Sequence, residues 1–278
     1  MDNLTVTAAI PVYNGSEFIG AAIESLLKQS HAADEIIVVD DGSSDDTAKI
    51  CLQYPIRLVQ HNENRGLAIA RNTVIKQSKS EVIAFIDSDA LAAENLVSVL
   101  LSGYTGSDTG GVGGQGIESN IQSVADRWRR AHASQSHGKR EKVVDHLFGL
   151  CMSYRTEVIR EVGGFSPVFR TNGEDVDAGL RITAFGYRLR YLPQAVVYHQ
   201  RTDDEASLLK TMANWYTAGY QAKKINKAHS RKLFLGVLRR MVTDTTHDLF
   251  IENDITMARL GWKVNQAKLR ALFNASSK

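Results

Sequence analysis

The feature that most constrains the fold is a regular alternation of strand and helix patterns over the first hundred residues. Glu35–Val39 is a nearly continuous apolar run, which is typical of a parallel strand buried on both faces. Similar apolar runs predict further strands at Thr5–Ile10, Ile56–Gln60 and Val82–Ile86. Segments with helical periodicity lie between the strands, at Ser16–Gln29 and Leu67–Gln77. This repeated strand-helix-strand order predicts an α/β fold with a parallel sheet wrapped by helices.

Charge is distributed unevenly along the chain. Residues 1–204 carry 20 Lys and Arg against 26 Asp and Glu, whereas residues 205–278 carry 13 against 5. We therefore expect a mildly acidic domain over residues 1–204 and a basic extension over 205–278. A nucleic-acid-binding domain carries its basic stripe on the fold itself, so the acidic body argues against a nucleic-acid partner.

The basic extension has a helical pattern, because the strand patterns stop after Asp204 and apolar residues recur at helical spacing to about residue 272. Its basic residues stand beside apolar ones; they are Lys223, Lys224, Lys227, Arg231, Lys232, Arg239 and Arg240. A basic amphipathic helix is favourable at an anionic membrane surface. Packing on another element explains most amphipathic helices. Three alternatives therefore stay open: peripheral membrane contact, a packed helical subdomain and a homodimer contact.

The cysteines and the apolar runs limit the class of protein. Cys51 and Cys151 are too far apart for a zinc or redox motif, so we expect two buried, reduced thiols. No apolar run approaches the roughly 18 residues of a membrane span, and no leader pattern precedes the first strand. We therefore expect a cytoplasmic protein, at the inner face of the membrane if the extension binds lipid.

Two pairs of carboxylates directly follow predicted strands, where open α/β sheets bind their ligands. Asp40 and Asp41 end the second strand, and Asp87 and Asp89 end the fourth. A single acidic residue after a strand is often only a turn or helix cap, but two pairs favour a shared site. Asp87 and Asp89 are suited to hold a divalent cation, Mg²⁺ or Mn²⁺, that bridges to substrate phosphates.

Glycine-rich phosphate loops are missing from the sequence. Neither Gly-x-x-x-x-Gly-Lys-Ser/Thr nor a Gly-x-Gly-x-x-Gly after the first strand occurs. A phosphorylated ligand would therefore have its charge met by a metal ion, by Arg71 or by backbone amides.

Six motifs occur in order over roughly residues 4–200. They are Pro11-Val12-Tyr13-Asn14-Gly15, EIIVVDDGSSDD from Glu35 to Asp46, NRGLAIARN from Asn64 to Asn72, FIDSDA from Phe85 to Ala90, Gly163-Gly164-Phe165 and Gly173-Glu174-Asp175-Val176-Asp177. Together they resemble the inverting family 2 glycosyltransferases. The resemblance implies the GT-A fold, a Rossmann-like, mostly parallel sheet flanked by helices, here with a helical C-terminal tail. It also implies transfer of a sugar from a nucleoside diphosphate sugar, with UDP favoured, to a hydroxyl of a glycan or glycolipid.

The resemblance further implies a nucleotide-sugar half over about residues 1–110 and an acceptor half over about 111–204, and it implies how the donor is held. The positions that match the nucleoside pocket are Pro11, Tyr13, Asp40 and Asp41, and Arg71 matches a basic position near the base and phosphates. Asp87 and Asp89 match the motif that binds the donor diphosphate through Mn²⁺ or Mg²⁺. His199 matches a histidine that completes this metal site, although a histidine at a strand end can also be purely structural.

The catalytic base implied by the resemblance is Asp175, and its neighbour Glu174 is the main rival. Successive residues in a helical turn diverge by about 100°, so the two cannot both face the reacting carbon. Each could also simply cap the following helix, because acidic residues are favoured in first turns.

Two other functions stay open at this stage. A nucleotidyltransferase that makes nucleotide sugars would use a related sheet, but such enzymes open with a basic glycine-rich loop that Pro11–Gly15 does not provide. A non-catalytic sugar-nucleotide-binding scaffold would have no need of intact Asp87, Asp89 and Asp175. Trp128 either stacks on an acceptor sugar or belongs to a helix core, and the core is favoured.

Overall fold

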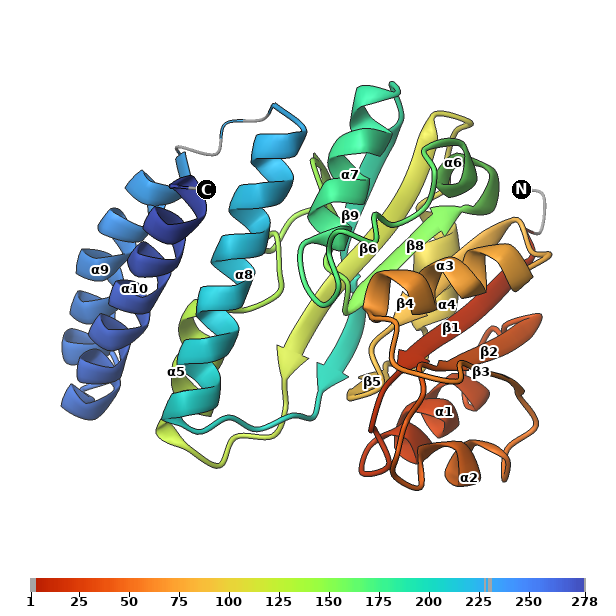
Figure 1. The fold of residues 1–278 in the computed structure, drawn as a ribbon, viewed down its shortest axis with the longest axis horizontal. Coiled ribbons are helices and arrows are strands. Elements are labelled where there is room, and N and C mark those ends of the chain that lie inside the picture. Colours follow the sequence, from red (N-terminus) through yellow and green to blue (C-terminus); the bar gives the residue numbers. More distant parts are fainter. Residues whose placement is uncertain (1–3, 228, 230–231, 278) are drawn as a thin grey trace. The chain divides into compact units, whose positions relative to one another are not determined.

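The structure is a computed structural model that describes residues 4–227, 229 and 232–277 (Figure 1). Arg231, one of the basic residues considered above, lies outside the described residues. The described chain divides into two compact units, one of residues up to 117 with 135–200, the other of residues 118–134 with the chain from 201 onward. Residues 118–134 lie within the domain expected over residues 1–204, but in the structure they group with the C-terminal helices.

The first unit is built on one sheet, with strand order β3-β2-β1-β4-β8-β6-β9-β5 and with β7 paired to β9 (Figure 1). The strands are β1 (Val6–Val12), β2 (Glu35–Asp40), β3 (Arg57–Gln60), β4 (Val82–Ile86), β5 (Ala90–Ala92), β6 (Thr109–Glu118), β7 (Lys142–Val144), β8 (Cys151–Arg155) and β9 (Arg188–His199). Strands β1 to β4 pair in parallel. The pairs β4 with β8, β6 with β8, β5 with β9 and β7 with β9 are antiparallel.

Strand β9 is longer than the sequence pattern suggests. Arg188–Tyr191 and Ala195–Tyr198 read as two short strands, because Leu192-Pro193-Gln194 interrupts the apolar run and proline gives no ladder hydrogen bond. In the structure the strand continues through this interruption. Gln115 of β6 donates its Nε2 to the carbonyl of Pro193 at 2.6 Å and so supports the chain at that point.

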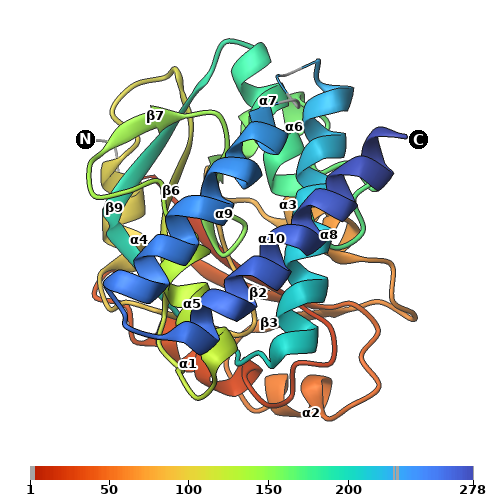
Figure 2. The same ribbon diagram turned by 90° about the vertical axis from the view of Figure 1, so that its left-hand side faces the viewer.

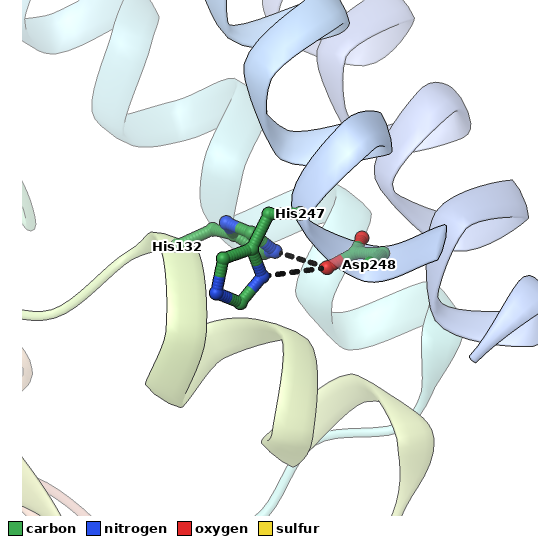
Figure 3. A group of neighbouring side chains, drawn as sticks. All are labelled: His132, His247 and Asp248. Carbon is green, nitrogen blue, oxygen red and sulfur yellow. Dashed lines mark hydrogen bonds and ion pairs between the residues drawn. The ribbon is translucent and has the colours of Figure 1, made fainter. Parts of the chain in front are cut away.

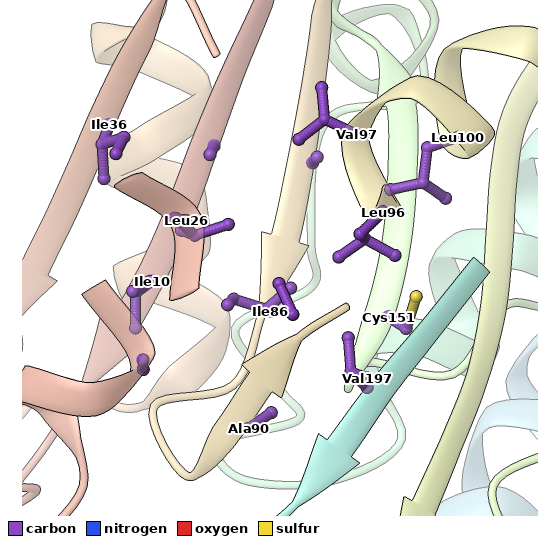
Figure 4. Close-up of a cluster of buried hydrophobic side chains, with 14 of the residues drawn as sticks. Ile10, Leu26, Ile36, Ile86, Ala90, Leu96, Val97, Leu100, Cys151 and Val197 are labelled. Carbon is purple, nitrogen blue, oxygen red and sulfur yellow. The ribbon is translucent and has the colours of Figure 1, made fainter. Parts of the chain in front are cut away.

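The sheet has a separate core on each face, because side chains alternate along every strand. On one face Ile10 and Ile86 pack with Leu26 and Leu96 (Figure 4). The helices of this face are α1 (Ile19–Leu27), α2 (Thr47–Cys51) and α4 (Leu96–Ser102); α3 (Leu67–Gln77), α6 (Thr156–Glu161) and α7 (Glu174–Ala184) cover the other. Both faces of β1, β2 and β4 are therefore buried, as a parallel sheet requires.

The second unit is helical (Figure 2). Its helices are α5 (Val124–His132), α8 (Glu205–Ile225), α9 (Lys232–Phe250) and α10 (Ile255–Ser276). Trp128 of α5 is fully buried among residues such as Leu208 and Val264, which confirms the core interpretation of this tryptophan. Buried Arg129 also ties α5 to the C-terminal chain, because its Nη2 contacts Glu118 Oε2 and the carbonyl of Arg201, both at 2.8 Å.

Two further expectations can be checked on the described chain. Cys51 and Cys151 are free and fully buried, as predicted. Among the described helices, none combines the length and the apolar character that crossing a lipid bilayer demands.

Candidate functional site

The turn between β4 and β5 carries Asp87 and Asp89. Strand β5 pairs with β9 so that Ala90 lies opposite His199, and the amide of Gln200 donates to the carbonyl of Asp89 at 2.8 Å. This pairing brings His199 Nε2 to 3.3 Å from Asp89 Oδ2. Both carboxylates of the turn are partly exposed, whereas His199 is nearly buried. The structure thus brings the three expected metal ligands to one sheet edge.

Arg71 of α3 lies beneath this turn and is 1% exposed. Its Nη2 donates to Asp87 Oδ1 at 3.0 Å and to the carbonyl of Gly149 at 3.1 Å, and its Nη1 is hydrogen-bonded to Glu174. Burial acts to lower the pKa of Arg71, but the charges of Glu174, Asp87 and Asp175 outweigh it and raise the pKa. Arg71 is therefore a permanent buried cation whose terminal nitrogens are already engaged by protein oxygens.

Glu174 and Asp175 open α7, directly after Gly173, whose φ of 90° lies in the left-handed region. Glu174 is buried against Arg71. Burial raises the pKa of Glu174 to about 7; Arg71 opposes the shift and the charge of Asp175 adds to it. Asp175 is only half-buried, and its Oδ2 accepts the amide of Gly149 at 3.0 Å. The two acidic side chains therefore have different surroundings, and Asp175 is the one that reaches solvent.

The pair Asp40 and Asp41, at the end of β2, is almost completely buried. Asp41 Oδ2 accepts the amide of Gly66 at 2.7 Å, and its Oδ1 lies 2.6 Å from His61 Nδ1. Asp40 accepts the amide of Ser43 at 2.9 Å. These carboxylates shape the loops after β2 and β3 through internal hydrogen bonds.

The segment after β1 offers an aromatic side chain. Tyr13 is 50% exposed, whereas Pro11 is buried within β1 opposite Val39. Asn14 accepts the amide of Ser44 at 2.8 Å and so joins this segment to the loop after β2. An exposed ring beside a loop of polar groups is suited to stacking on a nucleobase.

Two residues of the site were not found by sequence reasoning. His61 follows β3 directly, contacts Asp41 and lies 2.9 Å from Thr73 Oγ1 through its Nε2. The strand-end rule that identified Asp40 applies equally to His61 and could have found it. Gly149 contributes only backbone groups, its amide to Asp175 and its carbonyl to Arg71. No sequence signal marks such a residue.

Comparison with known sequences connects the chain to one family. The sequence profile described as Glycosyl transferase family 2 matches residues 7–163. The pre-mycofactocin glycosyltransferase of Mycobacterium tuberculosis is 32% identical over 207 residues, which cover 70% of this chain and 42% of that protein. The UDP-Glc:alpha-D-GlcNAc-diphosphoundecaprenol beta-1,3-glucosyltransferase WfgD of Escherichia coli is 38% identical over 105 residues, which cover 37% of this chain and 42% of that protein. The chain thus spans less than half the length of either relative.

Solved structures agree on the fold. The mannosyltransferase PcManGT of Pyrobaculum calidifontis, in complex with GDP-Man and Mn²⁺, superposes with a TM-score of 0.63 at 19% identity, covering 99% of this chain and 74% of that chain. GalNAc-T7 with UDP, GalNAc and Mn²⁺ gives a TM-score of 0.64 at 15% identity, covering 99% of this chain and 57% of that chain. The mixed sheet flanked by helices is therefore a GT-A fold.

Proposed function

Because the chain belongs to glycosyl transferase family 2, we propose that it transfers a sugar from a nucleoside diphosphate sugar, with UDP as the nucleotide, to a hydroxyl of a glycan or glycolipid. The observation that carries the proposal is the ion-pair chain in which Arg71 joins Asp87 to Glu174. These two ion pairs connect the carboxylates at the donor edge of the sheet to the start of α7, where Asp175 is half-buried. The name of the E. coli relative, which includes a diphosphoundecaprenol acceptor, supports the glycolipid option.

In the proposed reaction Asp87, Asp89 and His199 would hold Mn²⁺ or Mg²⁺. Two carboxylates and an imidazole suit Mn²⁺, whereas Mg²⁺ would depend on the carboxylate oxygens and water. The Mn²⁺ in both solved neighbours supports the same assignment. When bound, such an ion neutralises the negative charge that grows on the departing diphosphate.

Asp175 is the general base of the proposed reaction. The acceptor oxygen attacks the anomeric carbon, the bond from that carbon to the diphosphate oxygen breaks, and the hydroxyl proton passes to the carboxylate of Asp175. A single displacement of this kind inverts the anomeric centre and requires no second carboxylate as nucleophile. The amide of Gly149 orients Asp175, and Glu174 acts indirectly by holding Arg71 against Asp87.

The nucleoside would lie beside the loops after β1 and β2. Tyr13 provides the ring on which the base stacks. Buried Pro11 and Asp40 support the ends of β1 and β2 beneath the nucleoside, and Asp41 holds the loop at Gly66 in place. Arg71 acts on the donor phosphates through Asp87, since its own nitrogens are engaged by protein oxygens.

A donor screen tests this function. Binding of UDP-, GDP- and dTDP-sugars is measured calorimetrically with Mn²⁺, followed by release of the nucleoside diphosphate without acceptor. We expect binding and slow hydrolysis with the UDP-sugar, and neither in an Asp89→Ala variant. Pyrophosphate release from a nucleoside triphosphate and a sugar phosphate would instead indicate a nucleotidyltransferase. Donor binding without turnover, with or without acceptor glycans, would indicate a scaffold.

For the helical unit we propose peripheral contact with the cytoplasmic, inner face of a membrane. Leu235, Leu238, Val242 and Leu249 are exposed and recur at helical spacing along α9, with exposed Arg239 beside them. Each basic residue near anionic lipid contributes about 1 kcal/mol. Co-sedimentation with anionic vesicles at low salt tests this, with loss of binding expected in a Leu238→Glu, Val242→Glu variant. If the protein has twice the mass of one chain in solution and does not bind vesicles, the exposed apolar residues of α9 form a homodimer contact instead.

A further inference from the structure

A cluster of two histidines and an aspartate lies inside the helical unit, separate from the site described above. It consists of His132 on α5 and of His247 and Asp248 on α9 (Figure 3). One ligand atom of each residue lies within 4.8 Å of the others. We propose that these three residues form a second metal site, for a Zn²⁺-like divalent ion. Two imidazoles with one carboxylate form a donor set typical of zinc, whereas magnesium and calcium prefer oxygen ligands alone.

Two of the three distances between ligand atoms in the cluster can be compared with those around such an ion. Asp248 Oδ1 lies 3.5 Å from His247 Nδ1 and 2.5 Å from His132 Nε2. Two ligands of a tetrahedral ion with bonds of about 2.0 Å are about 3.3 Å apart. The spacing of His247 and Asp248 already matches, and a metal ion that replaces the proton between His132 and Asp248 has to separate them by about 0.8 Å.

The second nitrogen of each imidazole also faces a carboxylate. His132 Nδ1 lies 3.6 Å from Asp244 Oδ1, and His247 Nε2 lies 3.9 Å from Glu252 Oε1. Histidines that bind metal usually direct their other nitrogen to a carboxylate or carbonyl, which fixes the tautomer and orients the ring. At 3.6 Å and 3.9 Å neither contact is a hydrogen bond, so each histidine has a carboxylate near its outer nitrogen that would have to move closer to orient the ring.

The charges in the cluster call for a cation. Asp248 is 0% exposed, and its Oδ2 has no hydrogen-bond partner among the described residues. Asp244 is also buried; Asn265 and Thr243 donate to it at 3.4 Å, and the buried amine of Lys268 is close enough to interact with its charge. Buried carboxylates are unfavourable unless they are paired or bind a metal. A divalent ion supplies two positive charges while both imidazoles stay neutral.

The site joins distant parts of the chain. The side chain of His247 is 39% exposed, but its Nδ1, which faces Asp248, is buried and has no hydrogen-bond partner among the described residues, so water as a fourth ligand would have to enter together with the ion. His132 and Asp248 are 116 residues apart in sequence. An ion held between them would close a long loop and stabilise the packing of α5 against α9.

The experiment uses the full chain with Asp89→Ala and His199→Ala, so that two of the three ligands proposed for the donor site are missing. After chelator treatment, Zn²⁺ binding is measured by competition with a chromophoric chelator, and Co²⁺ binding by its visible absorption. We expect one Zn²⁺ per chain, the absorption of a four-coordinate Co²⁺ ion and a Tm that rises with added Zn²⁺. If this parent chain binds no Zn²⁺, His132 and Asp248 are joined by a shared proton and not by a metal ion, and the proposal is wrong.

Three variants of this parent locate the ion. His247→Ala removes a partly exposed ligand, and we expect the Kd for Zn²⁺ to rise at least ~100-fold, beyond the ~10–100-fold cost of losing an outer partner. Glu252→Gln removes only the carboxylate near the outer nitrogen of His247 and should raise the Kd for Zn²⁺ only ~10-fold. Thr246→Ala changes an exposed neighbour on the same helix and should leave binding unchanged. Zn²⁺ binding in His247→Ala equal to that of the parent would overturn the assignment.

Discussion

The guanidinium of Arg71 lies 3.0 Å from the carboxylate of Asp87, the first acidic residue after β4. Arg71 comes from the helix after β3, and its other terminal nitrogen is hydrogen-bonded to Glu174 at the start of α7. One buried cation thus fixes two acidic side chains that are far apart in sequence. Asp89 and Asp175, which are not hydrogen-bonded to Arg71, are also partly exposed.

Removing Asp89 should abolish metal-dependent donor binding. The Asp89→Ala variant loses a proposed metal ligand and the contact with His199, so calorimetric titration with UDP-sugar and Mn²⁺ should show no saturable heat. Glu94→Ala, an exposed acidic residue shortly after β5, serves as the control and should bind as the parent does. Full activity of the unaltered protein in excess EDTA would remove the metal from the mechanism.

Removing the charge of Asp175 should lower the rate of sugar transfer without weakening donor binding. Asp175→Asn keeps the shape of the side chain, so donor affinity should persist while transfer falls at least ~100-fold, the low end for a lost general base. Glu174→Gln should reduce transfer less and lower the Tm more, since Glu174 is the buried partner of Arg71. An inactive Glu174→Gln beside a near-normal Asp175→Asn would make Glu174 the base.

Arg71 should matter for stability as well as for donor binding. Arg71→Met leaves Glu174 buried without its cation, and breaking a buried pair costs about 3–5 kcal/mol. Urea unfolding should therefore show a clear loss of stability, and Arg71→Met combined with Glu174→Leu should recover part of it. Recovery of stability without recovery of donor affinity is the expected signature. If Arg71→Met alone is as stable as the parent, the ion pair of Arg71 with Glu174 does not stabilise the fold and the prediction is wrong.

Lys268 should make stability depend on pH. Its Nζ lies over the rings of Trp128 at 4.8 Å and Tyr216 at 5.1 Å. Burial, with a contribution from Arg240, lowers the pKa of Lys268 to about 7, against the effect of Asp244. Between pH 7 and about 10 the unfolded chain binds the extra proton, so this group makes stability rise with pH across that window, by ~2–4 kcal/mol in full.

The check for Lys268 is the midpoint of urea unfolding at pH 7, 8.5 and 9.5. Lys268→Met should be more stable than the parent at pH 7, and its midpoint should rise less with pH because the titrating group is gone. Identical pH profiles for the two proteins would show that Lys268 keeps its ordinary pKa in the folded state.

Sequence patterns predicted the parts of the site that depend on short-range order. Apolar runs located β2 and β4, and so placed Asp40 and Asp87 at the same sheet edge. The Gly173-Glu174-Asp175 segment marked the start of α7. These features follow from periodicity and from capping preferences within a few residues.

Other parts depend on contacts between distant segments and could not be predicted from such patterns. The helical period of α3 shows that Arg71 is on a helix, but its burial depends on Glu174, 103 residues away. The grouping of α5 with the C-terminal helices depends on the packing of Trp128 with Leu208 and Val264. The sequence showed only that α5 is a helix.

Gly149 has consequences for how acceptor and donor sites communicate. Its amide and its carbonyl are bound to Asp175 and Arg71 respectively, and a side chain here would place its Cβ 2.8 Å from Arg71 Nη2. A displacement of the loop before β8 therefore shifts the proposed base and the buried cation in the same movement. In the proposed single displacement these two groups act in the same step, so a substitution that moves this loop is expected to affect proton acceptance and leaving-group stabilisation together.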